Sequence, residues 1–205
     1  MNRLAGSIFV VLIALLTAIG SAVIVGRSQP LSPGITLLHL NECPLPCWIG
    51  IVPGETTVEQ ASRRIQAVYG SQAGVEVSGH DAQFLIHDTL HGSEFIVALY
   101  TEPDVQVSHD VIKTIWLGTL SKGDGPRLAE LYSIVGEPDA VVSGDLDLNS
   151  SSLSYFDQRM TLNFGFTGCS TIMNQVVGSI ILADSKMGRD KFASRLRPWR
   201  GFTRC

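Results

Sequence analysis

Residues 56–70 read Thr-Thr-Val-Glu-Gln-Ala-Ser-Arg-Arg-Ile-Gln-Ala-Val-Tyr-Gly, and they give the first firm element of the fold. Apolar residues recur along this stretch at helical spacing: Val58, Ala61, Ile65 and Val68. The charged residues lie off that stripe, so the pattern predicts an amphipathic helix. Thr56 as N-cap, with Glu59 three residues later, has the form of a capping box. Gly70 is expected to end the helix in the left-handed αL conformation.

Several short β-rich runs follow this helix, and a second helix further along the chain is again followed by short β-rich runs. The second helix is expected over Pro126–Val135, with Gly125 or Asp124 as its cap and Gly136 as its stop. Strands are predicted over residues 74–78, 82–87, 93–100 and 111–117, and then over residues 140–143, 153–157, 160–166 and 176–183. A polar loop is expected over residues 145–152, and an irregular tail over residues 184–205.

Both helices end with an apolar run before a glycine, Ile65-Gln66-Ala67-Val68-Tyr69-Gly70 and Leu131-Tyr132-Ser133-Ile134-Val135-Gly136. The expected fold class is therefore α+β, with two helices packed on antiparallel sheet, and a duplicated helix-plus-strands unit is one interpretation of the echo. The alternative is that any two amphipathic helices with glycine C-caps look alike.

An irregular loop rich in proline and glycine, residues 41–54, lies upstream of the first helix. A disulfide between Cys43 and Cys47 would close a tight loop within it, and one between Cys169 and Cys205 would tie down the C-terminal tail. Four cysteines allow three pairings, of which we favour this one. The alternative is redox or metal chemistry, although three residues separate Cys43 from Cys47 where a C-x-x-C redox motif has two.

The N-terminal residues 6–26, Gly-Ser-Ile-Phe-Val-Val-Leu-Ile-Ala-Leu-Leu-Thr-Ala-Ile-Gly-Ser-Ala-Val-Ile-Val-Gly, contain no charge. About 20 apolar residues in a helix span roughly 30 Å, which is the thickness of the hydrocarbon core of a bilayer. We expect residues 1–27 to be a transmembrane anchor. The alternative is a signal peptide cleaved near Gly20-Ser21-Ala22, where small residues suit a signal peptidase.

A linker with two prolines is expected over residues 28–34, and a single domain over residues 35–205, starting with a strand at Ile35–Leu40. The cationic N-terminus ahead of the apolar run favours a single-pass topology with the N-terminus cytoplasmic and the domain extracytoplasmic, although Arg3 and Arg27 give only a weak charge bias. Either fate of the N-terminal segment exports the domain, where disulfides are permitted.

The formal net charge of -4 excludes a basic surface for nucleic acid over most of the chain. Basic residues gather only near the C-terminus: Lys186, Arg189, Lys191, Arg195, Arg197, Arg200 and Arg204. They form either a solvated tail or a patch that touches anionic lipid or a partner.

The segment Pro46-Cys47-Trp48-Ile49-Gly50-Ile51-Val52-Pro53-Gly54-Glu55-Thr56-Thr57 resembles a P-C-W-x-G-I-x-P-G-x-T signature of uncharacterised, membrane-anchored bacterial proteins. The later Gly136-Glu137-Pro138-Asp139 resembles their G-x-P-D turn. The resemblance implies one N-terminal transmembrane helix and no established activity. A weaker likeness, in the helix that ends at G-x-P before antiparallel sheet, is to small lipoproteins of the outer-membrane assembly machinery.

Three sets of residues have the residue types of a metal or catalytic site, and each also has a structural explanation without such a site. His87 and His91 have metal-ligand spacing on a helix but are expected in a loop. Ser108-His109-Asp110 contains the residue types of a hydrolase triad, yet neighbours in sequence do not supply its geometry. Asp145, Asp147 and Asn149 match the start of a calcium loop that lacks its glycine and final glutamate. Trp48 is expected to pack over the adjacent cystine.

The sequence therefore predicts a membrane-tethered, extracytoplasmic, non-enzymatic binding or scaffold domain without cofactor or metal. Its partner would be an envelope protein or a cell-wall component. The alternative function is a thiol-disulfide enzyme or redox sensor that uses Cys43 and Cys47, and a third option is a purely structural stalk.

Overall fold

The computed structural model describes residues 2–28, 33–40, 42–70, 73–78, 81–88, 93–101, 111–119, 125–143, 150–165, 175–184 and 196–199. The chain divides into two compact units, residues 1–31 and 32–205. The first holds helix α1 (Asn2–Ser28). Its segment Ile8–Val25 is long and apolar enough to cross a membrane, and none of it is buried within the molecule. Burial of this surface therefore has to come from outside the chain.

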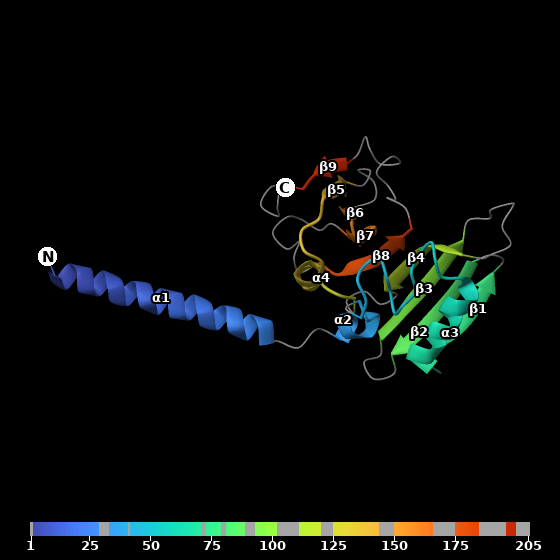
Figure 1. Ribbon diagram of the computed structural model, residues 1–205, viewed down its shortest axis with the longest axis horizontal. Helices are drawn as coiled ribbons and strands as arrows, with labels where there is room; N and C mark the ends of the chain where they lie inside the picture. Colours follow the sequence, from blue (N-terminus) through green and yellow to red (C-terminus); the bar gives the residue numbers. More distant parts are fainter. Residues whose placement is uncertain are drawn as a thin grey trace. The chain divides into compact units, whose positions relative to one another are not determined.

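The second unit is mixed α/β, with few helices and one large antiparallel sheet (Figure 1). Its helices are α2 (Pro33–Leu38), α3 (Val58–Tyr69) and α4 (Leu128–Val135). Its strands are β1 (Ala73–Ser78), β2 (Asp81–Asp88), β3 (Ser93–Thr101), β4 (Ile112–Thr119), β5 (Ala140–Ser143), β6 (Ser150–Tyr155), β7 (Met160–Gly165), β8 (Val177–Ala183) and β9 (Leu196–Pro198). Each strand predicted after the two longer helices is confirmed, with small shifts of its bounds.

The nine strands lie in the order β1-β2-β3-β4-β8-β7-β6-β5-β9, and every neighbouring pair is antiparallel. Helix α3 precedes the meander β1 to β4, and helix α4 precedes the meander β5 to β8. The two meanders join through their last strands, where Trp116 of β4 is opposite Ile181 of β8. We call residues 58–119 the first half and residues 128–183 the second half.

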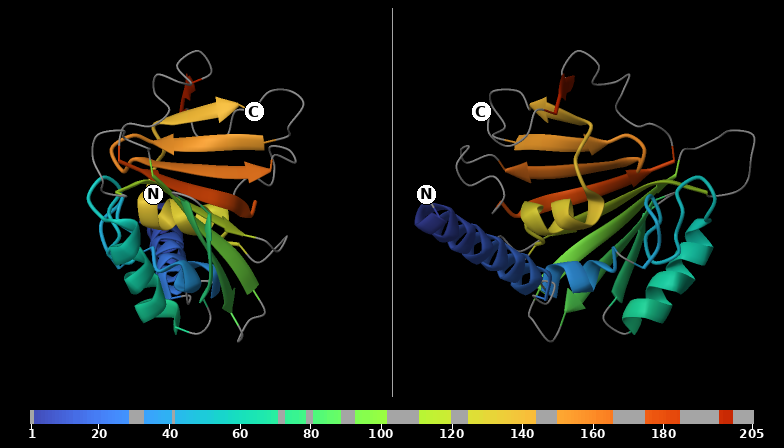
Figure 2. Two further views of the ribbon diagram at one scale, coloured as in Figure 1. Left: turned by 90° about the vertical axis from the view of Figure 1, so that its right-hand side faces the viewer. Right: turned by 60° about the vertical axis from the view of Figure 1, so that its left-hand side comes forward.

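One face of the sheet carries the core. Along β2 and β7 the fully or nearly buried residues alternate, as in Phe84 and Ile86, and they belong to one hydrophobic cluster with Ile65 of α3 and Leu131 of α4. Side chains alternate between the two faces of a strand, so the intervening residues point to the other face. Several of those, such as Ile96, Trp116 and Ile181, are only half-buried. In the left view of Figure 2, α2 and α3 lie on the same side of β2 to β4.

The two helix starts were placed slightly wrongly. The N-cap of α3 is Thr57, whose side chain accepts from the N–H of Gln60, because the hydroxyl of Thr56 already accepts from the N–H of Val52. Helix α4 starts at Leu128, since the segment before it is paired with the start of β8: Leu128 donates its N–H to the carbonyl of Gln175, and Val177 donates its N–H to the carbonyl of Pro126. Tertiary pairing here overrides the local signal of Pro126.

Where a strand was expected over Ile35–Leu40, the chain is helical as far as Leu38 and then forms a turn. An apolar run this short fits either structure, and its ambiguity is resolved by tertiary contacts at its C-terminal end. The serines from residue 150 onward pair with β7, where a loop was expected, and residues 196–198 form strand β9 on β5 within the tail expected to be irregular. The helix-ending Gly70 has φ 55 and ψ -128, so φ is positive but ψ lies outside the αL region.

Candidate functional site

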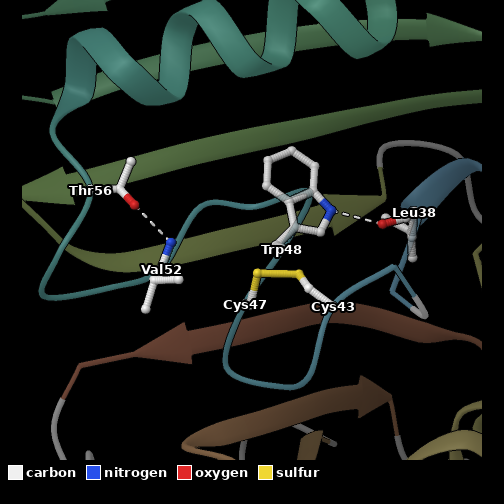
Figure 3. The surroundings of a disulfide bond; sticks show 6 residues. All are labelled: Leu38, Cys43, Cys47, Trp48, Val52 and Thr56. Atoms are coloured by element: carbon white, nitrogen blue, oxygen red, sulfur yellow. Dashed lines mark hydrogen bonds between the residues drawn. A yellow bond between two sulfur atoms is a disulfide. The ribbon is translucent and has the colours of Figure 1, made fainter.

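The signature segment folds into a compact loop that we call the Cys-Trp block, residues 43–56. A disulfide joins Cys43 to Cys47 across a Cα–Cα distance of 5.6 Å (Figure 3). Cys47 is 8% exposed and the adjacent Trp48 is fully buried. Trp48 is therefore a core residue that directly follows the disulfide in the chain.

A tight reversal follows Trp48. The backbones of Trp48 and Ile51 exchange hydrogen bonds of 2.9 and 2.7 Å, and the two residues between them, Ile49 and Gly50, have φ values of 44 and 78. Two central residues at positive φ are the mark of a type I′ turn, which usually has asparagine and glycine there. A β-branched residue in this conformation is a genuine outlier, and here Ile49 is only 4% exposed. Burial of its side chain offsets the conformational cost.

The Cys-Trp block and α3 together hold the end of α2. The indole N–H of Trp48 donates to the carbonyl of Leu38 at 2.7 Å, and the hydroxyl of Tyr69 donates to the carbonyl of Leu37 at 2.8 Å (Figure 3 shows the first). The last carbonyls of a helix lack intrahelical partners, so these two donors satisfy them. The rings of Trp48 and Tyr69 stack with centroids 6.3 Å apart.

Burial of the Tyr69 hydroxyl raises its pKa well above the ordinary value, and the charge of Glu42 raises it further. The phenol therefore stays protonated and keeps donating at any physiological pH. Its edge also contacts Phe95 of β3, with centroids 5.7 Å apart, so the chain entering the domain is tied to the sheet through one aromatic group.

The end of the signature attaches the block to β4. Gly54, at φ 89, donates its N–H to the carbonyl of Ile112 at 2.7 Å, and its Cα lies so close to Asp184 that an added Cβ would meet the Asp184 Cβ at 3.0 Å. Gly50 has a similar constraint, because a Cβ there would lie 2.9 Å from a guanidinium nitrogen of Arg64. The residues of the signature that are described here thus act in folding, through turns, burial and hydrogen bonds.

This environment does not support thiol-disulfide exchange. Reactive cysteines are exposed and lie in electropositive surroundings that favour the thiolate. Cys47 is buried next to the fully buried Trp48, and the two block cysteines are bonded to each other. Cys169 and Cys205 lie outside the described residues.

The other predicted candidates are only in part within the described chain. His87 lies in strand β2, and His91 lies outside the described residues, as do Ser108, His109, Asp110, Asp145, Asp147 and Asn149. Among the residues that the structure describes, no group of three or more His, Cys, Asp or Glu is placed to hold a metal ion.

Two surface features were not anticipated. One is a shallow, open groove lined by Gly50, Thr56, Gln60, Arg63, Arg64 and Ala67. Arg63 in it contacts Glu59 at 3.8 Å, and both groups are well exposed, so this ion pair contributes little. The other is the face of the sheet opposite the core, where Trp116 lies. Its signal in the sequence was the alternation along residues 112–117, which places Trp116 on the same face of the strand as Thr114.

Comparisons with known proteins add little. No protein-family model matches the chain, and no curated protein matches it. A solved structure that it resembles is a DUF4309 family protein (YjgB) from Bacillus subtilis subsp. subtilis str. 168, at 14% sequence identity and a TM-score of 0.42. The match covers 74% of this chain and 96% of that one.

Proposed function

We propose that this protein is a single-pass membrane protein that displays a non-enzymatic binding or scaffold domain on the extracytoplasmic side. The observation that carries the proposal is the fully exposed apolar segment Ile8–Val25 joined to a separate, self-contained α/β unit. A helix of this kind is stable in a bilayer and costly in water. The partner would be an envelope protein or a cell-wall component, and not nucleic acid.

The orientation is supported by the disulfide. Cysteine pairs stay reduced in most cytosolic proteins and oxidised outside the cytoplasm. The bond between Cys43 and Cys47, which joins a half-buried residue to a buried one beside the core, fits an oxidising compartment. The N-terminus would then be cytoplasmic.

The symmetry of the sheet supports a scaffold. Each half has a helix followed by four antiparallel strands, and each helix starts with a residue bridged to the segment before the fourth strand: Thr57 to Val111, and Arg127 to Val176. We propose that the halves derive from one duplicated unit in which two helices pack on a shared sheet.

Membrane fractionation and topology mapping of the full chain test the proposal. We expect the protein to resist alkaline carbonate extraction, to keep its N-terminal residues by intact mass, and to activate an alkaline phosphatase fused at its C-terminus. Leu12→Arg with Leu16→Arg should release it, since each arginine costs about 2.5–3.5 kcal/mol at the centre of a span. Leu12→Ile with Leu16→Ile is the matched control.

Three results would each count against the proposal. Extraction of the unchanged chain by carbonate would exclude the anchor, and loss of the N-terminal segment near Ala22 would show a cleaved signal. A fused phosphatase that stays inactive while a fused cytoplasmic reporter is active would exclude the orientation.

A further inference from the structure

The face of the sheet opposite the core has an unusual composition at its centre. In the central rows of the five strands from β3 to β6, the outward positions are filled by Ile96, Ala98, Tyr100, Thr114, Trp116, Gly118, Ser179, Ile181, Ala183, Thr161, Asn163, Ser152 and Ser154. We call this set the platform. Its small members Ala98, Ala183, Ser154 and Ser179 are buried, whereas Trp116 and Asn163 are half-buried. The platform contains an indole, a phenol, aliphatic groups, hydroxyls and an amide, and the charged Glu94 lies one outward position beyond Ile96. The side chains of the platform itself are uncharged, so the partner that it complements is uncharged and has both apolar and hydrogen-bonding surface.

The indole of Trp116 lies flat on this face. A Cβ added to Gly118 would be 2.0 Å from Cη2 and 2.4 Å from Cζ3 of Trp116, so the six-membered ring covers Gly118 directly. Gly118 is buried, whereas Trp116 is half-buried, so one face of the ring is pressed on the sheet while part of the indole stays exposed. Register places Ile96 and Ser179 on either side of Gly118, and so beside the ring.

Hydrogen-bonding groups stand next to the ring. Within the described part of the chain, the indole N–H of Trp116 has no acceptor. Ser152 donates to the Asn163 side-chain oxygen at 2.6 Å, and the Asn163 amide donates to the Ser179 hydroxyl at 3.0 Å. This row fixes the amide orientation and leaves one amide hydrogen of Asn163 unused, because an amide nitrogen carries two donors.

We infer that the platform binds a neutral carbohydrate chain, with a pyranose ring stacked on Trp116. Sugars combine an apolar C–H face, which packs on an aromatic ring, with hydroxyls at the rim that accept and donate hydrogen bonds. The exposed part of the indole takes the first, and the indole N–H and the Asn163 amide take the second. The inference deepens the proposed function and rests on it, because the tether would hold this face beside cell-wall polymers.

The test uses the full chain in phosphatidylcholine nanodiscs, which avoid sugar detergents, with the hexamer of N-acetylglucosamine as probe. We expect saturable binding by calorimetry, accompanied by a change in tryptophan fluorescence. Trp116→Tyr keeps a ring and should stay within about threefold of the native affinity. Trp116→Leu fills the space above Gly118 without a π face and should weaken binding tenfold or more, about 1.4 kcal/mol. Trp199→Phe is the control for the fluorescence change and should bind normally.

The comparison of tyrosine with leucine separates a ligand contact from a purely structural role. If Trp116 only covers Gly118, both variants will alter the unfolding midpoint while neither selectively alters binding, and the inference fails. Absence of binding by the native chain also overturns it. So would light scattering that shows a dimer which Trp116→Leu converts to monomer, since the platform would then bind a second copy. Each of these outcomes leaves the membrane fractionation result untouched, so the tether and the ligand are judged separately.

Discussion

The two halves of the sheet share their backbone design but differ in what is attached to it. The N-cap residues Thr57 and Arg127 have nearly the same conformation, with φ -80 in both and ψ 158 and 149. The C-cap residues Gly70 and Gly136 both have positive φ and donate to the carbonyl four residues back. Within the described residues, the backbone hydrogen bonds from the Cys-Trp block to the sheet go to Ile112 of the first half, and the block holds the disulfide and the fully buried indole of Trp48.

This difference indicates which features belong to the repeated frame and which were added. Caps and bridges recur, so they are requirements of a helix leading into a four-stranded meander. The Cys-Trp block has its contacts at the entry of the chain into the domain, where it holds α2 beside the first half. Its stabilising effect should therefore fall on the first half and on α2. Substitutions of graded severity can test this division.

The largest effect is expected for Trp48→Ala. The change removes a fully buried indole and leaves the Leu38 carbonyl without its donor, so the free energy of unfolding should fall by about 3–5 kcal/mol. Trp48→Phe keeps most of the packing and isolates the hydrogen bond, at about 1 kcal/mol. Urea unfolding of the full chain in nanodiscs measures both. A loss below about 1 kcal/mol for alanine would show that the block is not part of the core.

Removing the disulfide with Cys43→Ala and Cys47→Ala is expected to cause the second-largest loss of stability. The bonded residues are four apart in sequence, and the chain-entropy relation gives about 2 kcal/mol for so short a loop. The same burial predicts that the native bond resists mild reductant. Thiol titration before and after unfolding checks this. Rapid reduction of the folded protein would contradict a structural role for the bond.

Much of the frame could be predicted from sequence because its signals are local. Alternation along strands and apolar stripes ending at Gly70 and Gly136 are visible within a few residues. Errors arose where distant groups decide. The apolar run that begins at Ile35 is helical because Trp48 and Tyr69 donate hydrogen bonds to the last carbonyls of α2. Thr56 does not cap α3 because its hydroxyl accepts a hydrogen bond from the N–H of Val52.

The site was less predictable than the fold. The P-C-W-x-G-I signature is visible as a pattern, but its role in turns and burial depends on contacts with α2, β4 and Arg64 that the sequence does not encode locally. The platform was missed because its members come from five strands whose order is not sequential. Their common face exists only after β4 has paired with β8.

The two C-cap glycines offer a test in which both halves should respond equally. Gly70 and Gly136 have φ of 55 and 89 with ψ of -128 and -156, where an L-residue is strained, and neither has a neighbour within 4 Å of an added Cβ. Alanine at either position should therefore cost backbone strain alone, about 1–2 kcal/mol. Unfolding midpoints of the two variants measure it. Costs that differ strongly between the halves would show that the two helix ends are not equivalent.

The smallest effect, and the most direct comparison of the halves, is an exchange of caps. The hydroxyl of Thr57 accepts a hydrogen bond from the N–H of Gln60. The side chain of Arg127 has no acceptor, so this helix start has only the hydrogen bond from the Arg127 backbone N–H to the carboxylate of Glu130. Thr57→Ala should lose about 1 kcal/mol, while Arg127→Thr should gain up to about 1 kcal/mol, because the backbone already has the N-cap conformation. Gln60→Ala and Glu130→Ala serve as matched controls that remove the reciprocal bonds. If Arg127→Thr destabilises the protein, the arginine has a contact that the frame requires, and the two helix starts are alike only in their backbone.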